Sequence, residues 1–190
     1  MTSTLSSEQQ LLLAELHGYR AADEIEEQHR QDMIALVTEH EAWWHRDTLP
    51  GHITASAFVV TPDLSQLLLH FHRKLDRWLQ FGGHDEGEKH PAKAVLRELV
   101  EESGLQQFDF FGAPTFFDLD IHTIPESKKQ AQHLHFDVRY LFVANSEQEL
   151  TPADGESELL RWMDLEDASA ALDEEAAHRV CHKLLDLRNS

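Results

Sequence analysis

Cysteine, basic residues and long apolar runs are all scarce in this sequence. The single cysteine, Cys181, cannot form a disulfide within the chain and fits a reducing cytoplasm. No stretch approaches the roughly 18 apolar residues that a membrane-spanning helix needs. The first apolar run, LLLA, follows no basic segment, so we expect no signal peptide. These absences predict a soluble, cytoplasmic protein.

The shortage of basic residues leaves a strongly acidic chain. Lysine and arginine number 16 against 35 aspartates and glutamates, which gives a formal net charge of −19. Electrostatic repulsion therefore argues against binding to nucleic acid polymers or to anionic membranes. An acidic enzyme that handles phosphates usually recruits divalent cations, which cancel the repulsion. The four tryptophans argue against disorder, and 190 residues suffice for one domain with a buried core.

Residues 7–44 have the periodicity of helices. Apolar residues recur there at spacings of three and four, and Gly18 predicts a break between two helices. We interpret residues 1–48 as an N-terminal helical extension and residues 49–190 as the main domain. The apolar stripe between residues 11 and 37 makes a homodimer plausible.

The rest of the chain alternates between strand and helix patterns. β-Branched and alternating segments predict strands, and spacings of three and four predict helices. The expected strands are 53–61, 67–72, 77–81, 110–122, 133–144 and 158–165, and the expected helices are 91–103 and 165–187, the latter with a break near Asp173. Interleaved strands and helices predict an α/β fold with a mixed sheet.

The helix expected at 91–103 separates apolar from acidic side chains. Pro91 suits its first turn, and Gly104 suits the position just past its end. At about 100° per residue, the apolar set shares one side and the acidic set the other. The apolar set is Ala92, Val95, Leu96, Leu99, Val100 and Ser103, and the acidic set is Glu98, Glu101 and Glu102. Like charges crowded on one face favour a bound Mg²⁺ or Mn²⁺ ion. Taken alone, the cluster also fits a solvated acidic face.

The stretch around this helix resembles the Nudix box, G-x5-E-x7-R-E-U-x-E-E-x-G-U, where U is a bulky aliphatic residue. The matching residues are Gly83, Arg97, Glu98, Leu99, Glu101, Glu102, Gly104 and Leu105. The resemblance implies an α/β/α sandwich of the Nudix type and hydrolysis of a nucleoside diphosphate linked to another moiety. It implies metal binding by the three glutamates and the Gly82 carbonyl, and an orienting role for Arg97. Several Nudix proteins supply a further acid from a late loop, for which Glu156 is the candidate here.

One position departs from the box. Lys89 stands where the family has glutamate, and Glu88 lies one residue earlier. In the family that glutamate chiefly supports the box arginine, so Glu88 can replace it if the loop 84–89 takes a different path. A Nudix-fold protein that binds a nucleotide ligand without hydrolysing it is therefore the alternative function.

Two further strands have one polar and one apolar face. The polar residues are Asp118, Asp120 and His122 in the first strand, and His133, His135, Asp137 and Arg139 in the second. The loop 123–132 would let the strands pair as a hairpin, so that these residues form one polar surface. Histidine, aspartate and arginine bind metals, phosphates and polar rings.

The chain also resembles a Nudix subgroup with GGH, DIH-x-IP and H-x-H-x-D-x-R signatures. We therefore take as candidate substrate contacts His84, His135, Asp137 and Arg139. His133 and His135 alone, without cysteine, fall short of a structural zinc pattern. His70 and His72 are more simply strand residues than ligands of a second metal.

Hydrolysis of a diphosphate requires that its charge be neutralised and that water be presented in line. Bound Mg²⁺ or Mn²⁺ does both, and a nearby carboxylate takes the proton as general base. The expected partner is a small nucleotide-type diphosphate. An isomerase of a diphosphate ester would need a cysteine or a comparable base in its pocket, and Cys181 lies in the last predicted helix, where it is badly placed for that role.

Overall fold

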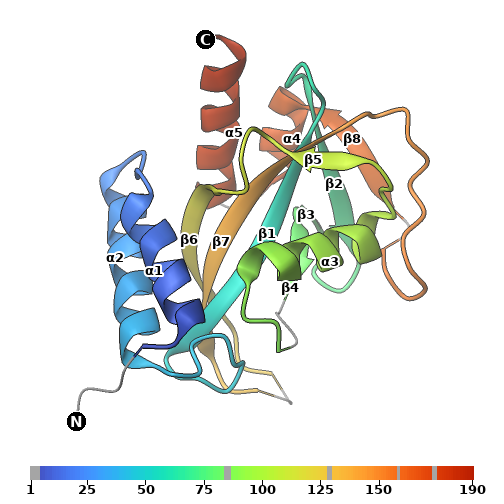
Figure 1. The fold of residues 1–190 in the computed structure, drawn as a ribbon. Coiled ribbons are helices and arrows are strands. Elements are labelled where there is room, and N and C mark those ends of the chain that lie inside the picture. The colour runs from blue at the N-terminus through green and yellow to red at the C-terminus, as the bar shows by residue number, and fades with distance from the viewer. Residues whose placement is uncertain (1–4, 84–86, 128–129, 158, 173–174) are drawn as a thin grey trace. The chain divides into compact units, whose positions relative to one another are not determined.

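A computed structural model describes residues 5–83, 87–127, 130–157, 159–172 and 175–190. Its helices are α1 (Ser7–Gly18), α2 (Glu24–Glu39), α3 (Pro91–Ser103), α4 (Leu165–Ala171) and α5 (Glu175–Arg188). Its strands are β1 (Gly51–Val60), β2 (Gln66–His72), β3 (Arg77–Leu79), β4 (Phe81–Gly83), β5 (Phe108–Phe110), β6 (Phe116–Ile124), β7 (His133–Ala144) and β8 (Leu160–Asp164) (Figure 1). The predicted α/β fold with a mixed sheet is confirmed.

The strands form one sheet in the order β3-β2-β1-β7-β5, with β4 paired to β1, β6 to β7 and β8 to β2. The chain divides into two compact units. The first unit comprises Met1–Ala55, Gly83–Ala94 and Thr115–Arg139, and the second comprises Ser56–Gly82, Val95–Pro114 and Tyr140–Ser190. Each unit is thus assembled from segments that are distant in sequence. The domain boundary predicted between residues 48 and 49 stays a prediction.

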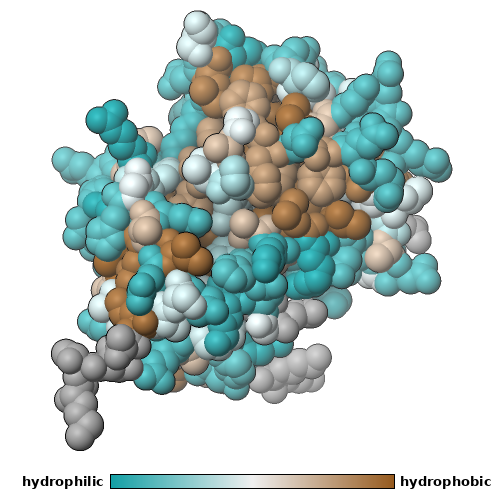
Figure 2. All heavy atoms as spheres, viewed as in Figure 1, coloured by the Kyte–Doolittle hydropathy of each residue, from teal (hydrophilic) through white to brown (hydrophobic). Residues whose placement is uncertain are grey.

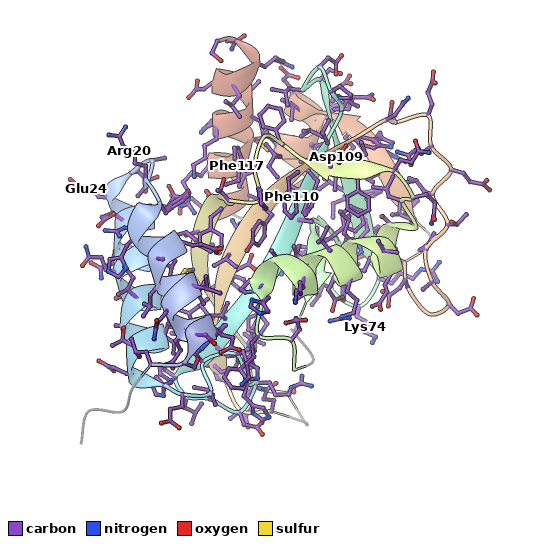
Figure 3. The ribbon with its side chains drawn as sticks, in the orientation of Figure 1. Arg20, Glu24, Lys74, Asp109, Phe110 and Phe117 are labelled. Carbon is purple, nitrogen blue, oxygen red and sulfur yellow. The ribbon has the colours of Figure 1, made fainter. Side chains whose placement is uncertain are left out.

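In the first unit, two capped segments form the helical pair α1–α2. A capping box starts α1: the Ser6 side chain accepts from the Gln9 N–H, and the Gln9 side chain accepts from the Ser6 N–H. The predicted break near Gly18 is confirmed, because α1 ends there. The helical pattern was expected to continue to Trp44, but α2 ends at Glu39. At the turn between the helices, Arg20 and Glu24 point outward (Figure 3).

The apolar stripe of residues 11–37 is mostly buried within the first unit. Leu12, Leu13, Leu16, Met33, Leu36 and Val37 are at most 8% exposed. Leu11 and Ile25 are more than half exposed, at 57% and 56%. In Figure 2 the visible face of α2 is largely hydrophilic, with a small hydrophobic group on α1. Since most side chains of the stripe are buried within the same chain, the stripe no longer supports a homodimer. The homodimer stays a prediction.

α2 is joined to β6 by buried hydrogen bonds in the same unit. The Glu26 side chain is fully buried and accepts from the Leu119 N–H at 3.1 Å and from the Ala22 N–H at 2.6 Å. The Tyr19 hydroxyl lies 2.5 Å from the same carboxylate. In Figure 1 the helical pair lies beside β6. α2 therefore covers one side of the hairpin formed by β6 and β7.

In the second unit, β2 is paired antiparallel with β1, β3 and β8. Leu68 lies opposite Val59 of β1 and opposite Trp162 of β8. The side chains of Leu67, Leu68 and Leu69 have no exposed surface. The predicted turn at Lys74–Asp76 joins β2 to β3, and Lys74 points away from the ribbon (Figure 3). Within the described residues, no helix is long and apolar enough to cross a membrane.

The single strand predicted at 110–122 is wrong. β5 ends at Phe110 and β6 begins at Phe116. Between them Gly112 adopts a φ of +79°, which interrupts the extended backbone, and Pro114 lacks the N–H that a strand ladder uses. The break predicted in the last helix separates α4 from α5, whereas Asp173 itself lies outside the described residues.

α3 has the predicted bounds, Pro91–Ser103. Val95 and Leu99 are fully buried, as their place on the predicted apolar side requires. Val100 was expected on that side too, but it is 42% exposed. Its position at the edge of the apolar arc explains the difference, because packing there depends on what lies opposite.

Gly104 ends α3 in a conformation that favours glycine. Its φ is +70°, and its N–H donates to the Val100 carbonyl at 2.9 Å. A Cβ at this position would lie 2.2 Å from the backbone carbonyl of Thr151. The chain around Thr151 therefore packs directly on the end of α3.

We predict that Gly104→Ala destabilises the protein more than Gly112→Ala. Gly112 has a similar φ of +79°, but no heavy atom lies within 4 Å of its would-be Cβ. Its substitution should cost about 1–2 kcal/mol of left-handed strain, whereas Gly104→Ala adds a backbone clash and should cost about 3 kcal/mol or more. Urea denaturation of both variants measures the difference, and equal losses would contradict this account of the helix end.

Candidate functional site

The three glutamates of α3 lie together with Arg97 in the second unit. Arg97 Nη2 is 2.8 Å from Glu98 Oε1, and Arg97 Nη1 donates to Glu101 Oε2 at 3.0 Å. The Glu98 side chain is 15% exposed and that of Glu101 48% exposed. One guanidinium thus aligns two carboxylates, an arrangement that agrees with the predicted orienting role of Arg97.

The third glutamate, Glu102, contacts the double glycine. Its Oε2 accepts from the Gly82 N–H at 2.8 Å. Gly82 has a φ of +136°, a backbone conformation that other residues rarely adopt. The hydrogen bond places the Gly82 backbone at the acid cluster, where the resemblance expected a carbonyl ligand.

Glu102 has the most perturbed carboxylate of this site. Burial, together with the charges of Glu98, Glu156 and Glu101, raises the pKa of Glu102 to about 8 against the opposing hydrogen bond from Gly82. A carboxylate that holds a proton at neutral pH because it is buried and lies near other acids is a typical precursor of a cation site.

A late loop packs on the end of α3 and adds Glu156. The Ala153 N–H donates to the Glu101 carbonyl at 2.8 Å, and the Glu156 N–H donates to the Ala153 carbonyl at 3.1 Å. Glu156 is exposed, and its charge acts on Glu102. The structure therefore brings together all the acids predicted for metal binding and catalysis, as Glu98, Glu101, Glu102 and Glu156.

The donor set of this acid cluster suits a hard cation. It contains carboxylate oxygens and the Gly82 backbone, and no sulfur or imidazole among its described members. Mg²⁺ and Mn²⁺ prefer such oxygen ligands. Besides burial, repulsion from the neighbouring acids raises the Glu102 pKa, and a bound cation would relieve this repulsion. The residues present therefore fit the metal that the sequence predicted.

Lys89 and Glu88 both have partners within the first unit. Lys89 Nζ lies 4.1 Å from the ring centroid of Trp44, as in a cation–π contact. Glu88 Oε1 accepts from the His90 N–H at 3.0 Å, one residue before α3 begins at Pro91. Glu88 thus stabilises the start of the helix, and its predicted support of the box arginine stays a prediction.

The polar faces of β6 and β7 meet, as predicted, but they are buried. Arg139 is fully buried, and its Nε, Nη1 and Nη2 lie 3.0, 3.3 and 3.0 Å from Asp137, Asp118 and Asp120. The Thr54 hydroxyl donates to Asp137 at 3.1 Å. The predicted polar surface is therefore largely a buried ion cluster, because α2 covers this side of the hairpin.

Electrostatics within this cluster favour the charged forms. Burial opposes ionisation of Asp120, yet the hydrogen bond from His122 and the charge of Arg139 hold its pKa at about 2. Burial likewise opposes the charge of Arg139, but the aspartates raise the Arg139 pKa above its ordinary value. Asp137 and Arg139 pair with one another and are buried away from solvent. We therefore interpret them as structural residues rather than as the expected substrate contacts.

The histidines expected at the site have different surroundings. His84 lies outside the described residues. His135 is half-buried and lies beside His52, whose ring centroid is 5.0 Å away. Sequence reasoning missed His52, for which the only signal is a histidine at the start of an apolar strand. His70 is stacked on Phe81, and burial lowers its pKa to about 4, which fits a packing role.

Comparison with known proteins places these features in a family. A profile of the NUDIX domain matches residues 50–185. Among solved structures, a NUDIX-family hydrolase from Clostridium perfringens is 29% identical with a TM-score of 0.54, over 72% of this chain and 97% of that one. The fold is therefore the α/β/α Nudix fold that the box implied.

Two structures of lower identity share the fold. The dihydroneopterin triphosphate pyrophosphohydrolase of E. coli is 13% identical with a TM-score of 0.54, covering 69% of this chain and 92% of its own. An Ap4A hydrolase of C. elegans is 17% identical with a TM-score of 0.54, covering 71% and 94%. None of the curated proteins compared with the chain matches it significantly. The chain belongs to the Nudix hydrolase family.

We predict that the metal-free protein becomes less stable as pH rises because of Glu102. Its folded pKa of about 8 lies above the ordinary pKa of 4.5, so the folded state holds a proton that the unfolded state has lost. Stability should therefore fall between those values, by up to about 1.4 kcal/mol per pH unit. Urea denaturation in a chelator at pH 5.5 and 7.5, for the native chain and Glu102→Gln, measures this. The prediction is wrong if the variant keeps the whole pH dependence.

We predict that Arg139→Met is strongly destabilising. Loss of the guanidinium removes the one cation that contacts all three buried aspartates, which should cost about 3–5 kcal/mol at neutral pH. Arg188→Met is the matched control, because Arg188 pairs with Glu166 at 2.9 Å on the surface and should cost less than about 1 kcal/mol. At acidic pH the difference in stability between the two variants should become smaller, because protonated aspartates no longer need the missing cation. Equal denaturation midpoints for the two variants would refute the structural role.

Proposed function

We propose that the chain is a metal-dependent pyrophosphohydrolase. Its substrate would be a nucleoside diphosphate linked to another moiety, and it would cleave the diphosphate linkage. The observation that carries the proposal is the convergence of Glu98, Glu101 and Glu156 on Glu102, whose pKa is raised to about 8. Family membership supports the same reaction class.

In this proposal Glu98, Glu101 and Glu102 hold Mg²⁺ or Mn²⁺ together with the Gly82 carbonyl. Such a cation neutralises phosphate oxygens and lowers the pKa of bound water. Arg97 keeps Glu98 and Glu101 aligned through two ion pairs of 2.8 and 3.0 Å. The helix thus presents its acids in a fixed geometry before substrate arrives, which avoids the cost of ordering them during the reaction.

Glu156 is the proposed proton acceptor. It is exposed, so water reaches it, and its loop is fixed to α3 by the hydrogen bond from Ala153 to Glu101. As a carboxylate close enough to perturb Glu102, it would take a proton from the attacking water as a general base. Glu102 is less suited to this role, because its carboxylate is largely buried and bonded to Gly82.

A second candidate function is nucleotide binding without turnover. Lys89, which replaces the box glutamate, has a contact of its own with Trp44, so that position is used for packing rather than left for a carboxylate. An isomerase reaction has less support. Cys181 is buried in α5, and burial raises the pKa of its thiol, which makes a nucleophilic or basic thiolate unfavourable.

We predict hydrolysis that depends on both the metal and the acid cluster. A panel of nucleoside diphosphate conjugates, dinucleoside polyphosphates and NADH, with Mg²⁺ or Mn²⁺ and product identification, should reveal at least one substrate. Glu101→Gln should lower kcat/KM by about 100-fold or more, as expected for a metal ligand. Glu147→Gln, which changes an exposed acid after β7, should leave kcat/KM unchanged.

The outcomes separate the two candidates. Tight binding of one panel member without product would favour the nucleotide-binding function. Equal activity of Glu101→Gln and Glu147→Gln would contradict the assignment of the acid cluster as the metal site. For Glu156→Gln, a fall in kcat with little change in KM is expected, since its proposed role lies in the chemical step.

A further inference from the structure

Three histidines gather in the first unit, where β1 and β7 begin. His52 lies in β1, and His133 and His135 lie in β7. Their candidate ligand nitrogens all lie within 4.8 Å of one another. The ring centroids form a nearly equilateral triangle, with distances of 5.2 Å for His52–His133, 5.0 Å for His52–His135 and 5.2 Å for His133–His135.

The backbone fixes this arrangement. A Cβ on Gly51 would lie 2.1 Å from the Leu134 carbonyl oxygen, so the absence of a side chain lets the two segments approach closely. His52 follows Gly51 directly. His133 and His135 flank Leu134 and project to one face, because side chains alternate along a strand. Three imidazoles are thereby brought to one place from segments about 80 residues apart in sequence, too far for a local motif.

The hydrogen bonding of His133 resembles that of a metal-binding histidine. Its Nδ1 lies 2.9 Å from the Ala131 carbonyl oxygen. Since a carbonyl can only accept, Nδ1 carries the hydrogen, and in the neutral imidazole Nε2 then carries the lone pair. His133 is 5% exposed, and its Nε2 is buried with no hydrogen-bond partner among the described residues. Histidines that bind metals usually donate their other ring N–H to a carbonyl or carboxylate in this way.

Simple ring packing explains this cluster less well than a ligand does. A buried acceptor without a partner costs about 1–3 kcal/mol, and His133 Nε2 is such an acceptor. The nearly complete burial of His52 (0% exposed) and of His133 excludes bulk water from that side of the cluster. A cation bound by the converging nitrogens would satisfy the lone pair and draw the rings together.

We propose that His52, His133 and His135 form a binding site for a borderline divalent transition-metal ion, with Zn²⁺ as the prime candidate. Imidazole nitrogens suit Zn²⁺, Ni²⁺ and Cu²⁺, whereas Mg²⁺ prefers oxygen. Tetrahedral Zn²⁺ with Zn–N distances of 2.0–2.1 Å needs nitrogens about 3.3 Å apart, so the rings close inward on binding. Three protein ligands leave the fourth position for water.

A histidine–carboxylate pair lies beside the site. The His122 ring lies 5.5 Å from that of His135, and His122 Nδ1 is bonded to Asp120 at 3.0 Å. This histidine–carboxylate pair borders the cluster without contributing a nitrogen to it. The site uses nitrogen donors throughout, in contrast to the oxygen donors of the acid cluster around Glu102. Its occupancy is therefore independent of the proposed hydrolase activity.

The experiment measures metal binding by the full chain. After treatment with a chelator, the protein is titrated with Zn²⁺ in competition with a chromophoric chelator, and the bound metal is counted by elemental analysis. One tightly bound equivalent is expected for the native chain and for Glu101→Gln. His135→Gln should bind it about 100-fold more weakly or worse. His72→Gln, which removes a strand histidine outside the cluster, should bind like the native chain.

A second measurement covers the case in which His135→Gln fails to fold. Co²⁺ added to the metal-free native chain should give the intense visible absorption of a tetrahedral nitrogen site, which Zn²⁺ then removes by displacement. The proposal is overturned by the weak spectrum of octahedral oxygen coordination alone. It is also overturned if His135→Gln folds and retains native Zn²⁺ affinity, or if Glu101→Gln removes the tight equivalent.

Discussion

Carboxylates that lie close together in a folded chain need a compensating charge or proton. This protein meets that need in different ways at its two clusters of acidic side chains. On the β6–β7 hairpin, three aspartates share the guanidinium of Arg139, which is fully buried among them. On α3, Arg97 pairs with Glu98 and Glu101. The pKa of the third glutamate, Glu102, is raised to about 8. The first group of acids is buried around its arginine, whereas the second is partly exposed, so that a proton or a cation can reach it.

The two treatments have opposite consequences. A buried ion cluster contributes rigidity but offers nothing to a ligand, because every exposed charge has been removed. A partly exposed cluster with excess negative charge is costly in the metal-free state, and that cost becomes binding energy when a cation arrives. Glu101, 48% exposed, lies on the solvent side of the second cluster. Exposure therefore distinguishes the proposed metal site from the buried ion cluster, although both have more acids than arginines.

Much of the acid cluster could be predicted because its geometry is local. The period of a helix places Glu98, Glu101 and Glu102 on one face, and Pro91 and Gly104 mark the ends of α3. Long-range features were less accessible. Alternation along β6 and β7 predicted which residues share a face, but alternation cannot show that α2 covers that face. Arg139 was therefore expected at a ligand, although it lies among aspartates.

The histidine cluster illustrates the same limit. His133 and His135 were visible as a pair, but the third nitrogen comes from His52, on a strand that the chain reaches about 80 residues earlier. The approach of His52 to the other two histidines depends on the close contact between Gly51 and Leu134, which the periodicity of the sequence does not predict.

The exposure of Val100 was missed for a related reason. Val100 lies at the edge of the apolar arc of α3, where exposure depends on neighbouring segments.

The effect of Lys89, which stands where the Nudix box has glutamate, is confined to the segment before α3. Lysine has a long apolar stem and a charged head, so it can lie over an aromatic ring without losing solvation, as Lys89 does over Trp44. Glu88 meanwhile accepts from the His90 N–H next to the start of α3, where a negative charge is favourable. Both charges thus have partners that would be lost if the two residues were exchanged to restore the box pattern. The substitution therefore changes how the segment before α3 is held and leaves the acidic face of the helix, whose geometry is set from Arg97 onward, with all its carboxylates.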